Sequence, residues 1–272
     1  MTKKHDIIWL DMTDSTNMEA SRRISELDNL SVLSASKQTS GRGQMGNSWE
    51  SETGKNLTFS ILLKSDNGSI FQVKACDQFI ISEAVALSVT DLLAAHGIPA
   101  KIKWPNDIYV GNRKICGILI QNSLRTGYVS SSIIGIGLNV NQTVFDVSLP
   151  NPISMMMLKD DMAGYPLNLN SLLEEFMDIF KGYCNCYLWG KESRSDLRKQ
   201  YLANMWRLDE TARFKDLSYY PDLDTCTERS SSKEREFTGI IRGLSPIGHL
   251  IVEDIEKGAL KEYAFREISY II

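Results

Sequence analysis

The sequence predicts an α+β protein with a large first domain and a small, β-rich second domain. Short apolar runs bounded by Gly, Pro and Asn recur between Ile7 and Val140, with one long apolar segment, 72–96, among them. After about Leu208 the chain changes to short strand-like runs separated by Gly and polar turns, the pattern of a small barrel. We therefore predict domains at 1–208 and 209–272.

Each element of the first domain has a local signal. Ile7–Leu10 has strand composition, and Ser15, Thr16 and Asn17 followed by Glu19 predict a capped helix to about Leu27. Helical periodicity predicts a long helix at 72–96, ended by Gly97, and two shorter helices at 172–187 and 193–202. The remaining strands are expected at 32–36, 57–63, 102–104, 108–110, 114–121 and 128–140, the later ones as an antiparallel meander.

The second domain is predicted from four short strands, at 212–214, 237–241, 250–253 and 262–265. Between the first two of them, residues 216–236 are polar, with three consecutive serines at the centre. Such a stretch is typical of a long loop between two strands of a small barrel.

Composition limits the classes of function. The chain has 272 residues, of which 43% are hydrophobic, enough for a substantial core. Its net charge of −4 disfavours general nucleic-acid binding. No secretory signal is evident, and no apolar stretch approaches the roughly 18 residues that a membrane span needs. The five scattered cysteines indicate reduced thiols in a cytoplasmic protein, and the three distant histidines disfavour a zinc site.

A glycine-rich loop, Gly41-Arg42-Gly43-Gln44-Met45-Gly46, matches G-x-G-x-x-G. That pattern binds dinucleotides where a helix begins at it, but here the chain continues through Trp49 toward the strand at 57–63. The Gly-Lys-Ser/Thr of a Walker A loop is absent. A flexible surface loop is one interpretation. The other is that the glycines bring backbone N–H groups close to an anion while Arg42 supplies a cation.

Three other segments have both a structural and a functional interpretation. The Ser15–Asn17 segment could only cap a helix, or it could bind a polar ring. Lys103-Trp104-Pro105-Asn106-Asp107 could be a hairpin corner, and Lys114 a solvated strand end. Alternatively Lys114 is a fixed cation in a site, because the following Cys116 and Gly117 leave room for a ligand to approach the backbone.

In this order and spacing, the glycine-rich loop, Lys103–Asp107, Arg113–Leu119 and Gly135–Val140 resemble the biotin protein ligases, or biotin–acetyl-CoA-carboxylase ligases. The resemblance covers about residues 6–142 and returns at 262–269. It implies a catalytic domain like that of class II aminoacyl-tRNA synthetases, followed by an SH3-like barrel. No winged-helix segment precedes the first strand, so the resemblance is to the form that ligates without repressing transcription.

The resemblance also implies a site. The catalytic residues would be Arg42, Lys114, Lys103 and Asp107. Biotin would be bound by polar partners of its ureido ring and by the loop, namely Ser15, Thr16, Asn17, Gln38, Gly41, Arg42, Lys114 and Gly117. ATP and the adenylate would contact Arg42, Gly43, Gln44, Trp49, Asn106, Lys114 and Asn139, although Gln44 and Met45 stand where some members carry arginines. No protein-held metal is expected. Mg²⁺ would be held mainly by the ATP phosphates, and Asp107 would either contact it or deprotonate the incoming lysine.

The reaction that the resemblance implies starts from biotin, ATP and Mg²⁺ and ends on a lysine of a biotin carboxyl carrier protein. The expected setting is the cytoplasm, without nucleic acid or membrane, and the open edge of the sheet is compatible with a homodimer. Two alternatives remain at this point. A lipoate or octanoate ligase or transferase shares the fold but needs an apolar tunnel, and a biotin-responsive regulator would have no ligase activity.

Overall fold

The computed structural model describes residues 5–64, 73–158, 166–190, 192–218 and 235–272. The chain divides into two compact units, Met1–Asn204 and Met205–Ile272. Each unit has its own sheet and is described by itself. Together they have the predicted α+β composition, and among the described residues the helices lie in the first unit.

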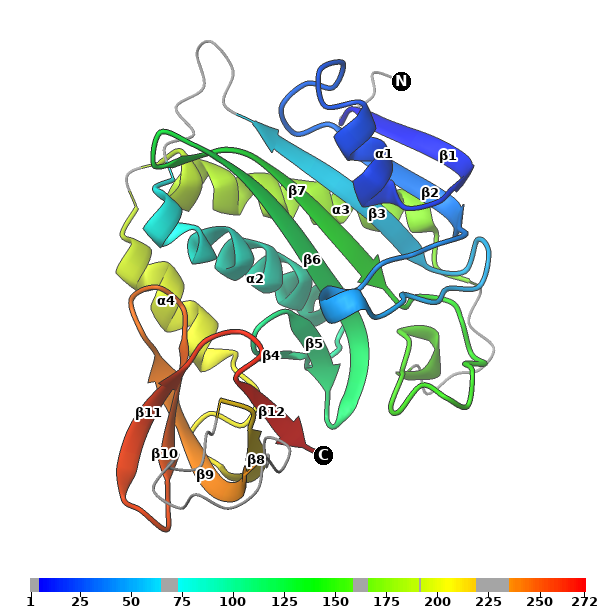
Figure 1. Ribbon diagram of the computed structural model, residues 1–272. Coiled ribbons are helices and arrows are strands. Elements are labelled where there is room, and N and C mark those ends of the chain that lie inside the picture. Colours follow the sequence, from blue (N-terminus) through cyan, green and yellow to red (C-terminus); the bar gives the residue numbers. More distant parts are fainter. Residues whose placement is uncertain (1–4, 65–72, 159–165, 191, 219–234) are drawn as a thin grey trace, which may run out of the picture. The chain divides into compact units, whose positions relative to one another are not determined.

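A seven-stranded mixed sheet organises the first unit (Figure 1). The strand order is β1-β2-β3-β7-β6-β5-β4; β1 and β2 are parallel, and all other neighbours are antiparallel. The prediction of a mixed, mostly antiparallel sheet is therefore confirmed. The strand bounds are β1 (Ile7–Thr13), β2 (Val32–Gln38), β3 (Leu57–Lys64), β4 (Lys101–Lys103), β5 (Asp107–Val110), β6 (Arg113–Arg125) and β7 (Tyr128–Leu138).

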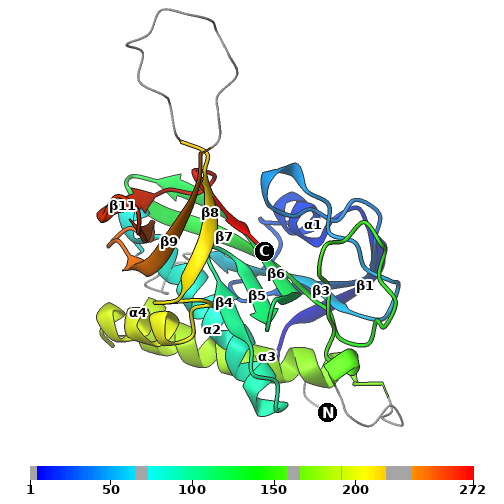
Figure 2. The ribbon, with the colours of Figure 1, turned by 90° about the horizontal axis from the view of Figure 1, so that it is seen from below.

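Helices cover both faces of this sheet. Figures 1 and 2 show α1 on one face and α2 and α3 on the other. The helices are α1 (Thr16–Arg22), α2 (Phe79–Ala95), α3 (Leu169–Tyr183) and α4 (Arg194–Ala203), and a π-helical turn, Cys184–Leu188, extends α3. Short 3₁₀ turns occur at Gln44–Gly46, Ala75–Asp77 and Met156–Leu158.

Some predicted helix bounds and caps were wrong in detail, and α3 begins at Leu169 rather than at the predicted residue 172. The long helix begins at Phe79, because Ala75–Asp77 forms a separate 3₁₀ turn. The capping box at the start of α1 does not form, since Ser15 makes no side-chain capping bond. The backbone N–H of Thr16 donates instead to Gln38 Oε1 at 2.8 Å, so an acceptor from β2 takes the place of a local cap. The same helix ends at Arg22, short of the predicted Leu27.

The length and composition of each helix show whether it could span a membrane. One helical stretch, Ala75–Ala95, is long and apolar enough to pass that test, which corrects the expectation that no such stretch exists. However, 72% of its most apolar window is buried inside the protein, as in the core helix of a globular fold. The apolar composition of α2 is therefore explained by packing against the sheet and the neighbouring helices.

The core of the first unit includes an aromatic cluster between β3 and α3. Phe176 is almost completely buried; its ring meets Phe59 edge to face at a centroid distance of 5.3 Å and stacks on Phe180 at 5.9 Å. We expect Phe176→Ala to lower the free energy of unfolding by about 3–5 kcal/mol, because a large cavity is left in a close-packed layer. Urea unfolding followed by circular dichroism measures this. Val144→Ala is the control, since Val144 is 77% exposed, and an equal loss in both variants would contradict the assignment.

The second unit is an antiparallel sheet in the order β11-β10-β9-β8-β12. Its strands are β8 (Thr211–Asp216), β9 (Arg235–Leu244), β10 (Leu250–Asp254), β11 (Ala259–Tyr263) and β12 (Ile268–Ile271). The last strand was not predicted. Among the residues that the structure describes, β11 and β12 do not pair, so the order is that of an open sheet. Residues 219–234 of the predicted loop lie outside the described residues.

Candidate functional site

Two rows of residues cross the central strands on the same face of the first sheet. The first row is Ser60 on β3, Gly135 on β7 and Leu119 on β6, which are register partners. The second row, two positions away on each of these strands, is Thr58, Gly137 and Gly117, and it continues to Asp107 on β5. Side chains two positions apart on a strand face the same side. Both rows therefore lie under α1 and the glycine-rich loop.

The first row holds the side chain of Asn17, which comes from α1. Asn17 Oδ1 lies 2.6 Å from Ser60 Oγ, and Asn17 Nδ2 donates to Leu119 O and to Gln121 Oε1, both at 3.2 Å. A Cβ atom on Gly135 would lie 2.3 Å from Asn17 Oδ1. Gly135 is therefore required by the protein's own asparagine, which lies against the strand.

The second row holds Trp49. A Cβ atom on Gly137 would lie 2.2 Å from the indole ring, and one on Gly117 would lie 2.9 Å from it. The loop fixes this tryptophan, because its backbone N–H donates to Gly41 O at 2.9 Å. The indole Nε1 is buried and has no hydrogen-bond partner among the described residues. The space that the sequence analysis assigned to a ligand at Gly117 is thus occupied by Trp49.

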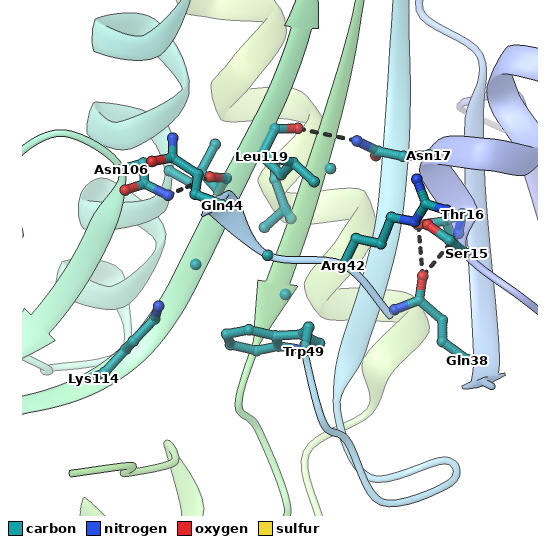
Figure 3. A pocket seen from close by; sticks show the side chains of 16 residues that line it. Ser15, Thr16, Asn17, Gln38, Arg42, Gln44, Trp49, Asn106, Lys114 and Leu119 are labelled. Atoms are coloured by element: carbon teal, nitrogen blue, oxygen red, sulfur yellow. Dashed lines mark hydrogen bonds between the residues drawn. The ribbon is translucent and has the colours of Figure 1, made fainter. Parts of the chain in front are cut away.

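The polar groups near α1 have defined orientations. Gln38 Oε1 accepts the backbone N–H of Thr16 at 2.8 Å and lies 3.2 Å from the Thr16 hydroxyl oxygen. A backbone N–H can only donate, so the Gln38 atom facing it is the oxygen. Gln38 Nε2 has no hydrogen bond within the described parts of the chain and remains a donor. Figure 3 shows Gln38 on one side of the cavity and Lys114 on the other, with Trp49 between them.

The start of α1 is held by an ion pair. Asp14 accepts the backbone N–H of Ser15 at 2.7 Å and two bonds from the Arg22 guanidinium, at 2.7 and 2.9 Å. The hydrogen bonds from Arg22 hold the pKa of Asp14 well below its usual range. Ser15 itself is buried, and its side chain lines the cavity.

Lys114 supplies a cation at the opposite side. Its Nζ lies 2.7 Å from Asp107 Oδ1 and 5.6 Å from the centroid of the Trp49 ring. Its backbone N–H donates to Asn151 O at 2.8 Å, and its carbonyl accepts from Ile153 N at 3.0 Å. Because the segment 151–153 adds to the sheet beside it, Lys114 is fixed in place although its ammonium group reaches solvent.

Two cavities share Trp49 and Lys114. The first has a volume of about 50 Å³, and it is lined by most of the predicted ligand-binding residues, Ser15, Thr16, Asn17, Gln38, Arg42, Gly43, Gln44, Trp49, Asn106, Lys114 and Gly117. The second has a volume of about 410 Å³ and includes Asp107 and Asn139. Small-molecule pockets usually start at roughly 300 Å³. The first cavity therefore admits a ligand only if Trp49 moves off Gly117 and Gly137.

Part of the second cavity was missed by the sequence analysis. Its outer wall is formed by the segment that follows β7, through the side chains of Phe145, Leu149, Pro150, Asn151 and Pro152. The only sequence signal was Pro150-Asn151-Pro152, which indicates a turn. Asn139 lies deeper; its Nδ2 donates to Ile153 O at 3.0 Å, while its buried Oδ1 has no partner within the described residues.

Two predicted residues line neither of these cavities. Gly41 contacts the loop itself, because a Cβ atom there would lie 2.4 Å from Trp49 O. Lys103 Nζ lies 3.3 Å from the hydroxyl of Tyr109 and 4.8 Å from the centroid of its ring. Tyr109 is buried, which raises the pKa of its hydroxyl and keeps it neutral. Within the described ranges, no group of three or more His, Cys, Asp and Glu side chains could hold a metal ion.

Cys116 lies between Lys114 and Gly117 in the sequence, but its thiol is not part of the cavity lining. Burial raises the pKa of the Cys116 thiol, and the nearby ammonium group of Lys114 only partly opposes this effect. We expect iodoacetamide to alkylate the exposed Cys76 in the folded protein and to leave Cys116 unmodified. Peptide mass spectrometry measures this, with urea-unfolded protein as the control. Equal modification of both cysteines in the folded protein would contradict the burial.

Comparison with known proteins places this geometry in a class. The fold is that of the biotin protein ligases: the structure of the Aquifex aeolicus enzyme in complex with biotin and ATP matches with a TM-score of 0.72 and 24% identity, covering 99% of both chains. The model of the biotin/lipoate A/B protein ligase family matches residues 9–139. This match, over just under half of the chain, agrees with the resemblance seen in the sequence.

Curated relatives are similar over parts of their length. The chain is 40% identical over 111 residues to the bifunctional ligase/repressor BirA of Bacillus spizizenii, a match over 41% of this chain and 33% of that protein. It is 33% identical over 183 residues to biotin–protein ligase 1 of Arabidopsis thaliana, over 64% of this chain and 48% of that protein. The chain thus spans a third to a half of these two proteins.

Proposed function

We propose that the protein ligates biotin to a specific lysine of a biotin carboxyl carrier protein, with ATP as the energy source and biotinyl-5′-adenylate as the intermediate. The observation that carries this proposal is the hydrogen-bonding capacity that remains free beside α1. Both Asn17 Nδ2 hydrogens are engaged, which leaves an oxygen lone pair as an acceptor. Gln38 Oε1 accepts the backbone N–H of Thr16, which leaves its nitrogen as a donor.

One free acceptor and one free donor complement a cyclic urea, which offers N–H groups beside a carbonyl oxygen. Ser15 lines the same cavity, and its hydroxyl can donate or accept a hydrogen bond. An acyl chain such as that of lipoate or octanoate has no group to satisfy these polar atoms, and polar atoms left unpaired in a closed site reduce affinity. This supports biotin over the acyl substrates.

The proposed chemistry has two balanced steps. A carboxylate oxygen of biotin attacks the α-phosphorus of ATP, forms the acyl–phosphate bond and releases pyrophosphate. The amine of the acceptor lysine then attacks the acyl carbon, loses a proton and releases AMP. Lys114, fixed by the segment 151–153 and ion-paired to Asp107 at 2.7 Å, would stabilise the negative charge that develops at phosphorus. Asp107 would be released from Lys114 to accept the lysine proton or to contact Mg²⁺.

The second cavity is the proposed place of the nucleotide. Its 410 Å³ volume suits a base and ribose, and its shared residues, Trp49 and Lys114, would lie between the nucleotide and biotin. A Trp49 indole that leaves the second row could stack on the adenine. Mg²⁺ commonly keeps several waters and binds substrate phosphates with one or two carboxylates, so a single Asp107 carboxylate fits an ion brought in by ATP.

All of these residues belong to the unit Met1–Asn204, so we propose that this unit is catalytic. The second unit is proposed to be an SH3-like accessory domain. We propose that the protein acts in the cytoplasm with a carrier domain as its macromolecular partner, and its net charge of −4 disfavours nucleic acid as an alternative partner.

The test is incubation of the pure protein with biotin, MgATP and a biotin carboxyl carrier domain, read by intact mass spectrometry. We expect one biotin per carrier, attached to one lysine, and no addition when ATP is left out. Parallel reactions contain lipoate or octanoate in place of biotin. Addition of lipoate or octanoate but not biotin would show that the protein is a lipoate or octanoate ligase or transferase instead. No addition from any of the three acids would refute the ligase proposal.

A further inference from the structure

Ser60 lies beneath the residues proposed to bind the ureido ring, but it lines neither cavity. Its side chain is completely buried on β3. Its hydroxyl oxygen lies 2.6 Å from Asn17 Oδ1 and 2.7 Å from Thr16 Oγ1. Buried hydroxyls are nearly always hydrogen-bonded. Here both partners belong to the ligand-binding set, so the hydroxyl connects two members of that set from below.

The contacts around Ser60 share few hydroxyl protons, one from Ser60 and one from Thr16. Asn17 Oδ1 carries none, and two oxygens 2.6 Å apart without a proton between them would repel each other, so the Ser60 proton lies on this contact. The single Thr16 hydroxyl proton then fills the second contact, at 2.7 Å, in preference to the longer 3.2 Å contact with Gln38 Oε1. On the other side of the amide, Leu119 O can only accept, which requires the Asn17 nitrogen there. Ser60 and Leu119, at opposite ends of the first row, therefore fix which end of the Asn17 amide is oxygen.

We infer that Ser60 is a positioning residue, which sets the orientation of the Asn17 amide and thereby the recognition of a ureido N–H group. This inference rests on the proposed function. Gly135, between Ser60 and Leu119 in the row, leaves room for the amide to lie against the strand. Without the Ser60 hydroxyl, the acceptor that faces the ligand loses its support, and an amide nitrogen facing a ligand N–H would repel it.

The first test is Ser60→Ala, measured as the initial rate of biotin-dependent pyrophosphate release. We expect the KM for biotin to rise about 10- to 30-fold, while kcat and the KM for ATP stay within about twofold, as expected for the loss of a ground-state binding contact. Ser132→Ala is the matched control, since Ser132 is also completely buried, on β7, and its hydroxyl has no partner among the described residues. A biotin KM for Ser60→Ala within twofold of wild type would overturn the inference.

The second test asks whether Ser60 acts through Asn17. If it does, the variant Ser60→Ala/Asn17→Ala has the same biotin KM as Asn17→Ala alone, because coupled residues are not additive. A further rise by the full factor in the double variant would overturn the inference. Ser60→Cys keeps a similar volume with a weaker donor, so it must show a smaller rise in the same direction even if the alanine variant folds poorly. Wild-type protein that releases no pyrophosphate with biotin would instead refute the proposed function.

Discussion

Lys114→Ala is expected to reduce the rate of adenylate formation by about 10²- to 10³-fold, the usual effect of removing one preorganised charge from a developing anion. The ammonium group of Lys114 lies at the junction of the two cavities, where the carboxylate and the α-phosphate would meet. Lys114 is held in the sheet by backbone hydrogen bonds to Asn151 and Ile153, which do not involve its side chain, so the substitution should leave the fold unaffected. Pyrophosphate release without a carrier domain isolates this step.

Two further variants define what the lysine contributes. Lys114→Arg keeps the charge but not the compact geometry of an ammonium group, so we expect it to recover only part of the rate. Lys101→Ala is the matched control, because Lys101 is an exposed lysine of the same sheet, lines neither cavity and donates from Nζ to the carbonyl of Ala203. A Lys114→Ala variant with the rate of Lys101→Ala would show that the charge at phosphorus is stabilised by another group.

The strand pattern made most of the first sheet predictable. The strands between Val32 and Leu138 have β-branched and apolar composition and clear turn signals, so each was located within a few residues from sequence alone. The α1 helix was less accurate, because its first N–H is satisfied by Gln38, which is distant in sequence. A local capping rule has no access to an acceptor on another strand.

The site was predictable in its motifs but not in its construction. Gly117 was interpreted as room for a ligand, whereas in the structure it makes room for Trp49, as Gly135 does for Asn17. Ser60 carried no signal at all, because its importance depends on its register with Gly135 across two strands. Register and side-chain direction are set by the whole sheet, so a sequence motif can name the residues of a site without showing which of them support the others.

The second unit shows a related limit. Ile268–Ile271 is only four residues long and follows a turn, so its local sequence does not distinguish a strand from an irregular C-terminal segment. In the structure it is an edge strand that pairs with β8, from Ile268 opposite Asp216 to Ile271 opposite Arg213. Its strand character comes from this long-range pairing, which is why short strands are poorly predicted by local composition.

On the proposed function, we expect the two glycines of β7, Gly135 and Gly137, to differ in their effect on biotin binding. We expect Gly135→Ala to raise the KM for biotin about 100-fold, because the new Cβ would displace Asn17 from both Ser60 and Leu119. Gly137→Ala would instead displace Trp49, whose ring would lie 2.2 Å from the added carbon. Because the indole has to leave Gly137 before a ligand enters the first cavity, Gly137→Ala should not raise the KM for biotin as Gly135→Ala does.

Kinetics with each substrate varied at saturation of the other measure the two effects. Gly182→Ala on α3 is the control, because a Cβ atom there meets nothing within 4 Å and alanine favours helix. If both β7 variants changed the two KM values by the same factor, the first and second rows would not act as separate binding surfaces. A rise of the biotin KM in Gly135→Ala alone would instead mean that these alternate positions on one strand have different roles: Gly135 admits Asn17, which recognises the acid, and Gly137 admits Trp49, which has to move before a ligand enters the first cavity.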